Sequence, residues 1–231
     1  ISSIDTTKHD YQLIKTIKEH NNLIEKLLKE KEVAFDTETT SLNTDEAELL
    51  GISFCFKKNK VFYAAFPYSK DEIQPFISLY KDFFASSTLK IAHNIKYDQA
   101  VLKNYDRNIS GPIYDTMIAH YLIDPEKRHS LDRLATNLLN YSTIKIESLI
   151  GKKGVNQLNM KEVELEKFKQ ESPLLEHVKT CWNTKELDII YQTFLHVDSL
   201  QNESPRDDIC KNIYLQTIDD IITMKEQNIT E

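Results

Sequence analysis

The feature that most constrains this chain is the run Val33-Ala34-Phe35, which leads directly into Asp36-Thr37-Glu38. Three successive apolar residues predict a buried strand, which the acidic residues continue. Because residues i and i+2 of a strand project from one face, Asp36 and Glu38 are expected side by side. Two adjacent carboxylates repel each other unless a cation lies between them, and hard oxygen ligands favour Mg²⁺ or Mn²⁺. The pair therefore indicates either a divalent-metal site or an acidic strand end that faces water.

The composition is that of an ordinary globular protein. The chain has 231 residues, of which 40% are hydrophobic and 10% aromatic, and this suits one large domain with appendages. No apolar run approaches the roughly 18 residues of a membrane span, so no membrane partner is expected. The cysteines Cys55, Cys181 and Cys210 lie far apart, which is typical of a reducing compartment. The start at Ile1 suggests a processed or excised piece of a longer protein.

The charge balance limits the classes of partner that the chain is expected to bind. It carries 29 basic and 36 acidic residues, for a net charge of −7 at pH 7. This argues against a protein that grips nucleic acid by bulk electrostatics. A small site centred on a metal remains compatible with a nucleic-acid end, because bound cations reverse the local sign of the charge.

The apolar pattern predicts a mixed sheet flanked by helices. Residues 10–31 are expected to be mostly helical, in two pieces that break at Asn21-Asn22. Strands at 49–56 and 61–66, joined by a polar turn, predict an antiparallel meander with the organising strand. A strand at 89–93 then alternates with helices. Further helices are expected at 71–84, 95–105, 116–122, 130–139, 173–196 and 206–227. This order is typical of an α/β layered domain.

A second candidate site residue, Asp98, follows the strand predicted at 89–93. Ligands gather at the strand ends of an α/β sheet, so Asp98 is expected to meet Asp36 and Glu38. The alternative interpretation is an ordinary helix start, with Asn94 as its cap and Asp98 facing solvent.

Together these residues resemble the 3′–5′ exonuclease (proofreading) domain of family A, DNA polymerase I-type DNA polymerases. The run from Asp36 to Leu42 resembles its first motif, and His93-Asn94-Ile95-Lys96-Tyr97-Asp98 resembles its second. The likeness continues through Arg128-His129 and Gly151, and covers roughly residues 33–194. The resemblance implies a ribonuclease H-like fold, an exonuclease domain over residues 1–200, and an exit helix at 201–231 that leads toward an absent polymerase domain. The A/T-biased composition is similar to that of apicoplast replication polymerases of apicomplexan parasites, which would place the protein in a plastid.

The third motif departs from the family pattern, which has a tyrosine and then an aspartate four residues later. One register places Trp182 and Glu186 at these positions, and the other places Lys179 and Asn183 there. We prefer the first, because the second would send Glu186 inward, a costly burial. A third interpretation is that Trp182 belongs to the core and Glu186 to the surface, so that the third motif is absent.

The resemblance also implies a mechanism and a set of contacts. Two Mg²⁺ or Mn²⁺ ions would promote hydrolysis of the terminal phosphodiester at a single-stranded DNA 3′ end. Metal ligation and catalysis would fall to Asp36, Glu38, Asp98 and Glu186, with Trp182 in the place of the family tyrosine. Contacts to DNA would come from Leu42, Asn94, Arg128 and Ile146. Two rival functions stay open: a ribonuclease D-like RNA exonuclease, and a catalytically degenerate scaffold of a polymerase.

Overall fold

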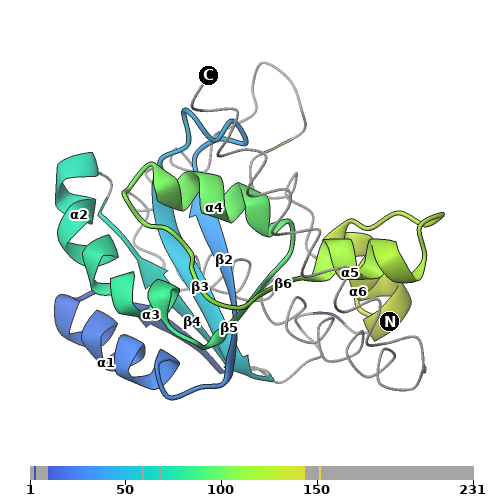
Figure 1. Cartoon of the computed structure of the whole chain (residues 1–231), viewed down its shortest axis with the longest axis horizontal. Helices are drawn as coiled ribbons and strands as arrows, with labels where there is room; N and C mark the ends of the chain where they lie inside the picture. The colour runs from blue at the N-terminus through green and yellow to red at the C-terminus, as the bar shows by residue number, and fades with distance from the viewer. Residues whose placement is uncertain (1–2, 4–9, 59, 68, 144–150, 152–231) are drawn as a thin grey trace.

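The computed structural model of the chain describes Ser3 and residues 10–58, 60–67, 69–143 and 151. This part forms one mixed sheet with helices packed around it (Figure 1). The strands are β1 (Asp10–Ile14), β2 (Glu32–Thr39), β3 (Leu49–Lys57), β4 (Lys60–Ala65), β5 (Leu89–Ala92) and β6 (Ile113–Asp115). Their order across the sheet is β1-β4-β3-β2-β5-β6. The predicted α/β class is confirmed.

The sheet combines a meander with parallel strands. Strand β3 pairs antiparallel with both β2 and β4, as predicted for the meander. Strand β5 pairs parallel with β2, and β6 pairs parallel with β5. β2 therefore lies between the two halves, and its neighbours supply the surroundings of the acidic pair.

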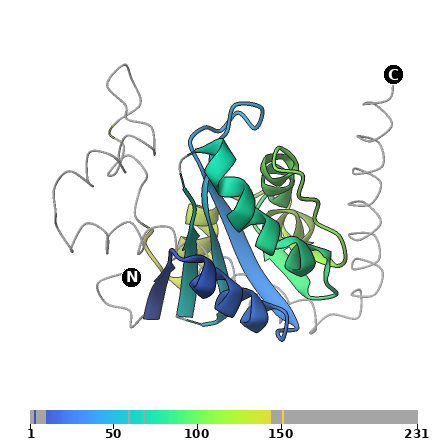
Figure 2. The ribbon, with the colours of Figure 1, turned by 90° about the vertical axis from the view of Figure 1, so that its left-hand side faces the viewer.

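Four helices cover one face of this sheet. They are α1 (Ile17–Leu27), α2 (Lys70–Leu79), α3 (Lys81–Ala85) and α4 (Ile95–Lys103). Their apolar side chains pack with Val33 and Phe35 of β2 in the main hydrophobic core, and Figure 2 looks onto α1 and α2 with the strands behind them. The opposite face holds a smaller cluster around Ala34, Cys55, Val61 and Ile91. Helices α5 (Thr116–Ile123) and α6 (Leu131–Leu139) lie away from α1 and α2 (Figure 1).

The prediction for residues 10–31 was wrong in two respects. Residues 10–14 form strand β1, which pairs in parallel with β4 from Asp10↔Lys60 to Ile14↔Ala64. Helix α1 begins only after Thr16, whose hydroxyl accepts the Glu19 N–H while the Glu19 carboxylate accepts the Thr16 N–H. This capping box fixes the helix start. The helix then continues unbroken through Asn21 and Asn22, which are exposed and need no cap there.

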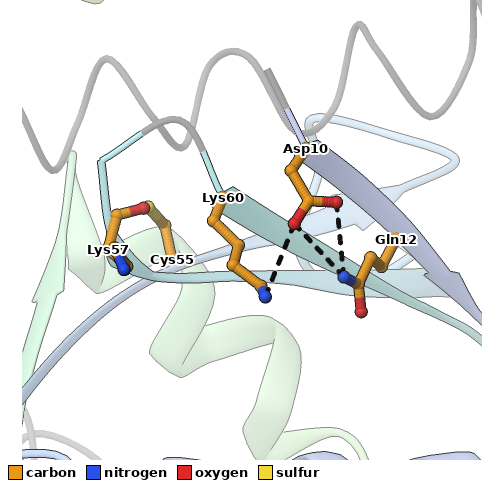
Figure 3. Close-up of polar contacts among 5 residues, drawn as sticks. All are labelled: Asp10, Gln12, Cys55, Lys57 and Lys60. Atoms are coloured by element: carbon orange, nitrogen blue, oxygen red, sulfur yellow. Dashed lines mark hydrogen bonds and ion pairs between the residues drawn. The ribbon is translucent and has the colours of Figure 1, made fainter. Parts of the chain in front are cut away.

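Polar contacts at the outer edge of the sheet support the pairing of β1 with β4 (Figure 3). The Asp10 carboxylate lies 3.4 Å from the Lys60 ammonium and accepts a hydrogen bond from the Gln12 amide at 3.3 Å. Next to them the β3–β4 register shifts between Cys55 and Lys57. There the Cys55 thiol donates to the Lys57 carbonyl. Such a bulge bends the strand that carries it and interrupts regular pairing.

Within the described ranges the remaining predicted elements are present with small changes, whereas the helices predicted at 173–196 and 206–227 lie outside those ranges and stay predictions. Residues 71–84 form two helices, α2 and α3, that meet at Tyr80, whose ring is fully buried. Strand β6 was not predicted, because three residues are too few to show a period. None of the helices in the described ranges is both long enough and apolar enough to cross a membrane.

Candidate active site

The predicted acidic pair lies near the end of β2. Asp36 pairs across to Ser53 of β3, and Glu38 pairs to Gly51. Both therefore project from the face that carries Ala34 rather than the helix-covered face of Phe35. Glu38 is buried at 7% exposure and Asp36 is half-buried. A register shift follows between Glu38 and Thr39, and bulges often occur beside active sites, where they redirect side chains.

Gly51, opposite Glu38, allows a close approach that we did not predict from the sequence. A Cβ atom at this position would lie 2.5 Å from the hydroxyl oxygen of Tyr63 on β4. The Tyr63 ring therefore lies across Gly51, on the face that holds the acidic pair. The one signal in the sequence was an isolated glycine within a strand, which often marks such an approach.

Asp98 lies in the first turn of α4, and its carboxylate reaches β2. Its Oδ1 accepts hydrogen bonds from the Thr37 N–H at 2.9 Å and the Thr37 hydroxyl at 2.7 Å. Thr37 stands between Asp36 and Glu38, so Asp98 is bonded to the residue that separates the acidic pair. Asp98 is only 1% exposed, which excludes the solvent-facing alternative. Burial, opposed by the Thr37 hydrogen bonds and reinforced by the charge of Asp115, raises the pKa of Asp98 to about 7.

Tyr97, next to Asp98, contributes a hydroxyl to the same region. It donates to the Ser41 carbonyl at 2.5 Å and also bonds the Thr39 hydroxyl. Burial raises the pKa of Tyr97, and the charges of Asp98, Asp36 and Glu38 raise it further. The Tyr97 hydroxyl therefore lies in the field of all three carboxylates. Sequence reasoning had assigned no role to this residue.

The Tyr97 hydroxyl holds the segment that presents Leu42. Ser41 directly precedes Leu42, whose side chain is 93% exposed. A second contact comes from the end of α4, where the Asn104 amide donates to the Thr44 carbonyl at 2.6 Å. An exposed leucine on a segment fixed from both sides suits contact with a ligand better than contact with the core.

The start of α4 is capped by Asp115 and not by the predicted Asn94 side chain. Asn94 occupies the cap position in a left-handed conformation (φ 65°) and makes no side-chain capping bond. The Asp115 carboxylate instead accepts from the Asn94 and Ile95 N–H groups at 3.0 and 2.9 Å. It also accepts from Met117 and Ile118 at the start of α5. The Asn94 Oδ1 atom is buried and has no hydrogen-bond partner among the described residues.

His93 is a packed residue. Its Nδ1 lies 2.9 Å from the Thr116 hydroxyl, which donates to the Ala92 carbonyl. Burial lowers the pKa of His93 to about 4, so the ring is neutral near pH 7. The ring also bonds the backbone of His129, in the segment between α5 and α6. Arg128, next in sequence to His129, is exposed.

Several predicted site residues lie outside the described ranges. These are Trp182 and Glu186, the alternatives Lys179 and Asn183, and Ile146. The exit helix predicted at 206–227 lies outside them too. The third motif and its register therefore remain predictions.

The carboxylates in the described ranges are suitable ligands for a divalent ion, but they are too few to complete a metal site. Within the ranges that the structure describes, no three acidic, histidine or cysteine side chains are arranged to hold a metal. Asp36 and Glu38 offer two carboxylates on one face, and both hydrogen bonds from Thr37 go to Oδ1 of Asp98. Carboxylate oxygens are the ligands that Mg²⁺ and Mn²⁺ prefer. A complete site would need a further ligand such as the third motif would supply.

Solved structures with the same architecture include nucleases. NrnC of Brucella melitensis bound to pGG matches with a TM-score of 0.59 and 16% identity, over 90% of this chain and 88% of that one. RNase D of Trypanosoma brucei matches with a TM-score of 0.59 and 12% identity, over 82% and 65%. Likeness at this level of identity concerns the fold alone. It places the chain in the ribonuclease H-like exonuclease fold.

Sequence relatives define the family more closely. A family model described as 3′–5′ exonuclease matches residues 11–172. DNA polymerase I of Borreliella burgdorferi is 34% identical over 233 residues, covering 99% of this chain and 24% of that protein. DNA polymerase I of Pseudomonas aeruginosa is 32% identical over 170 residues, covering 68% and 18%. The chain belongs to the 3′–5′ exonuclease domain family of DNA polymerase I, hydrolases that act on nucleic acid. It spans a quarter or less of the length of these relatives.

Proposed function

We propose that this chain removes 3′-terminal nucleotides from single-stranded DNA by metal-dependent hydrolysis, as the proofreading domain of a DNA polymerase. The observation that carries the proposal is that three carboxylates lie around one residue of β2, Thr37, and that the charges of all three act on the Tyr97 hydroxyl. Asp36 and Glu38 flank Thr37 on β2, and Asp98 binds it from α4. A purely structural role would not require three acidic side chains at one strand end, because their mutual repulsion and desolvation cost free energy.

A pair of divalent ions fits this arrangement of ligands. Asp36 and Glu38 would hold one ion together with Glu186, and Asp36 with Asp98 would hold the second. When bound, the ions would lower the pKa of an attacking water and stabilise the leaving 3′ oxygen. Trp182 would stand where the family has its tyrosine. Its indole N–H donates but cannot accept, so a weakened activity is expected.

The remaining residues of the site would position the strand end. Leu42, held on its segment by Tyr97, would pack against the terminal base. The buried Oδ1 of Asn94 would accept a hydrogen bond from the terminal nucleotide, which would satisfy an atom that otherwise has no partner among the described residues. Arg128 would contact the backbone, and the aliphatic Ile146 would replace a stacking residue.

Membership of the DNA polymerase I family favours DNA over RNA as substrate. The fold itself is common to ribonuclease D and to NrnC, so it does not separate the two substrates. The much greater length of the relatives supports a polymerase domain as the partner within a longer parent chain. An apicoplast-type origin and a plastid location remain further proposals, which rest on composition.

The test is degradation of a 5′-labelled single-stranded DNA in Mn²⁺, compared between the native chain and Asp36→Ala. Stepwise shortening from the 3′ end that is lost in the variant would support the proposal, and a labelled RNA of the same sequence would rank the substrates. Glu186→Ala and Asn183→Ala then separate the two registers. If neither protein shortens the DNA while circular dichroism shows both folded, the chain is a degenerate scaffold.

A further inference from the structure

The segment between α5 and α6, together with the face of α6 that carries Arg133 and Asn137, forms an open pocket of about 280 Å³. The described residues that line it are Lys127, Arg128, Arg133 and Asn137. Three cations and an amide therefore meet in a chain whose net charge is −7. The volume exceeds that of several water molecules at about 30 Å³ each, so a phosphate group fits.

The described side chains that line this pocket include no carboxylate, although Asp124, Glu126 and Asp132 lie near them in sequence. Lys127 lies 2.7 Å from the Asp124 carboxylate, so its charge is largely offset. Asp132, on α6, accepts a hydrogen bond from the Thr143 hydroxyl at 2.6 Å. Neither Arg128 nor Arg133 has an acidic partner among the described residues. Two exposed guanidinium groups beside an amide donor suit phosphate oxygens, which arginine binds in a bidentate manner.

The pocket is tied to the face of the sheet that carries the acidic pair. Leu131, at the start of α6, packs against the cluster of Ala34, Cys55, Val61 and Ile91. Ala34 precedes Asp36 by two residues and projects from the same face of β2.

The pocket is also tied to the second motif. His129 follows Arg128 directly and lies 2.7 Å from His120 of α5, Nδ1 to Nδ1. The buried ring of His93 bonds the backbone of His129. The pocket thus extends from a segment that is anchored both to the second motif and to the face of the sheet that carries the acidic pair.

We infer that this pocket binds the phosphate backbone of the single strand upstream of the nucleotide being removed, with Arg128 and Arg133 as its anchors. This rests on the proposed function and extends it to α6, because Arg133 and Asn137 lie outside every motif discussed above. It also explains how an acidic chain retains a polyanion. The charged contacts to the strand would come from the two arginines and the carboxylate site, so bulk charge is not needed.

The test measures binding and cleavage separately in Arg133→Gln and Arg128→Gln/Arg133→Gln. Binding of a fluorescent 12-nucleotide single strand is followed by anisotropy in EDTA across a range of salt concentrations. The double variant is expected to bind roughly tenfold more weakly, and its log K against log[salt] slope to fall by about 1.4, since each single-strand phosphate contact contributes about 0.7. Lys18→Gln/Lys29→Gln, which removes one exposed charge on α1 and one just after it, is the matched control and should change neither quantity.

Cleavage then distinguishes backbone binding from damage to the site. In Mn²⁺ the double variant should lose more of its kcat/KM on the 12-nucleotide strand than on a dinucleotide, mainly through KM, because a dinucleotide has no upstream phosphates to reach the pocket. An unchanged affinity and salt slope would overturn the inference, as would equal losses on both substrates. If the native chain shows no cleavage at all, the proposed function fails, and the anisotropy result still decides whether the pocket binds the strand.

Discussion

Asp98 of α4 accepts both the backbone N–H and the hydroxyl of Thr37, the residue that separates Asp36 from Glu38 on β2. One side chain thereby fixes the distance between the helix that follows β5 and the strand that carries the acidic pair. The Asp98 carboxylate is buried, and burial raises its pKa to about 7. Burial of this charge lowers the stability of the fold, and perturbed carboxylates of this kind cluster at functional sites.

Asp98→Asn is expected to stabilise the metal-free protein at pH 8 and to abolish activity. The folded protein takes up a proton at Asp98 near pH 7, whereas the unfolded chain does so only near its ordinary value of 3.8. The stability contributed by this group is therefore lowest above pH 7 and rises as the pH falls toward 4. Asparagine keeps an oxygen acceptor for Thr37 and removes the buried charge, so the free energy of unfolding should increase by about 1–3 kcal/mol at pH 8.

Urea unfolding in EDTA at pH 8 and pH 4.5 measures this effect. A gain that is equal at both pH values would contradict it. Asp98→Ala serves as the control, because it removes the charge but leaves the Thr37 N–H without its acceptor.

Tyr97→Phe is expected to raise KM severalfold with a smaller change in kcat. The variant loses the hydroxyl that binds the Ser41 carbonyl and the Thr39 hydroxyl, so the Leu42 segment is no longer held. The free energy of unfolding should fall by only about 1 kcal/mol. A double-mutant cycle with Leu42→Ala tests whether Tyr97 acts through Leu42. If it does, the changes in KM caused by the two substitutions should not add. Additive effects would show that Tyr97 acts in another way.

Asp115→Ala is expected to destabilise the protein by about 2–4 kcal/mol, because one carboxylate satisfies N–H groups at the starts of both α4 and α5. Asp115→Asn, which keeps one acceptor, should lose about half as much. Chemical denaturation measures both. Asp132→Ala is the comparison, since that side chain lies in the first turn of α6 and bonds only Thr143 among the described residues. Similar losses in Asp115→Ala and Asp132→Ala would contradict the double-capping role.

His20 is expected to lower the stability of the native chain as the pH falls from about 6.5 to about 4, a contribution opposite in sign to that of Asp98. This ring is fully buried against Phe66 and Phe76, its Nδ1 lies 2.7 Å from the Tyr80 hydroxyl, and burial lowers its pKa to about 4. The unfolded chain binds a proton in this range while the folded protein does not, so stability falls by up to about 1.4 kcal/mol per pH unit for each such group. His93 contributes with the same sign.

His20→Phe should flatten this pH dependence while lowering stability at pH 7.5, because Tyr80 loses its partner. Unfolding by urea between pH 4 and 7.5 tests the slope. A variant as steep as the native chain would show that His20 does not contribute.

Some features of this protein could be derived from the sequence because they depend on neighbours along the chain. The period of two places Asp36 and Glu38 on one face whatever the rest of the fold does. The meander of β3 and β4 follows from two apolar runs around a polar turn. Asp98 lies one helical turn past a strand, which brings it to the strand ends of an α/β sheet. Local spacing therefore determined the candidate site in outline.

Contacts between segments that are distant in sequence determined the features that the sequence did not predict. Residues 10–14 form a strand because β4 offers them a parallel edge, although Leu13, Ile14 and Ile17 are spaced as in a helix. Asn94 was the expected cap, yet Asp115 reaches α4 from 20 residues further along. Whether Asp98 faces water or Thr37, and which strand the Tyr63 ring crosses, depends on packing between elements that are distant in sequence. Hydrogen bonds and burial of this kind have no local signal, so only the tertiary structure shows them.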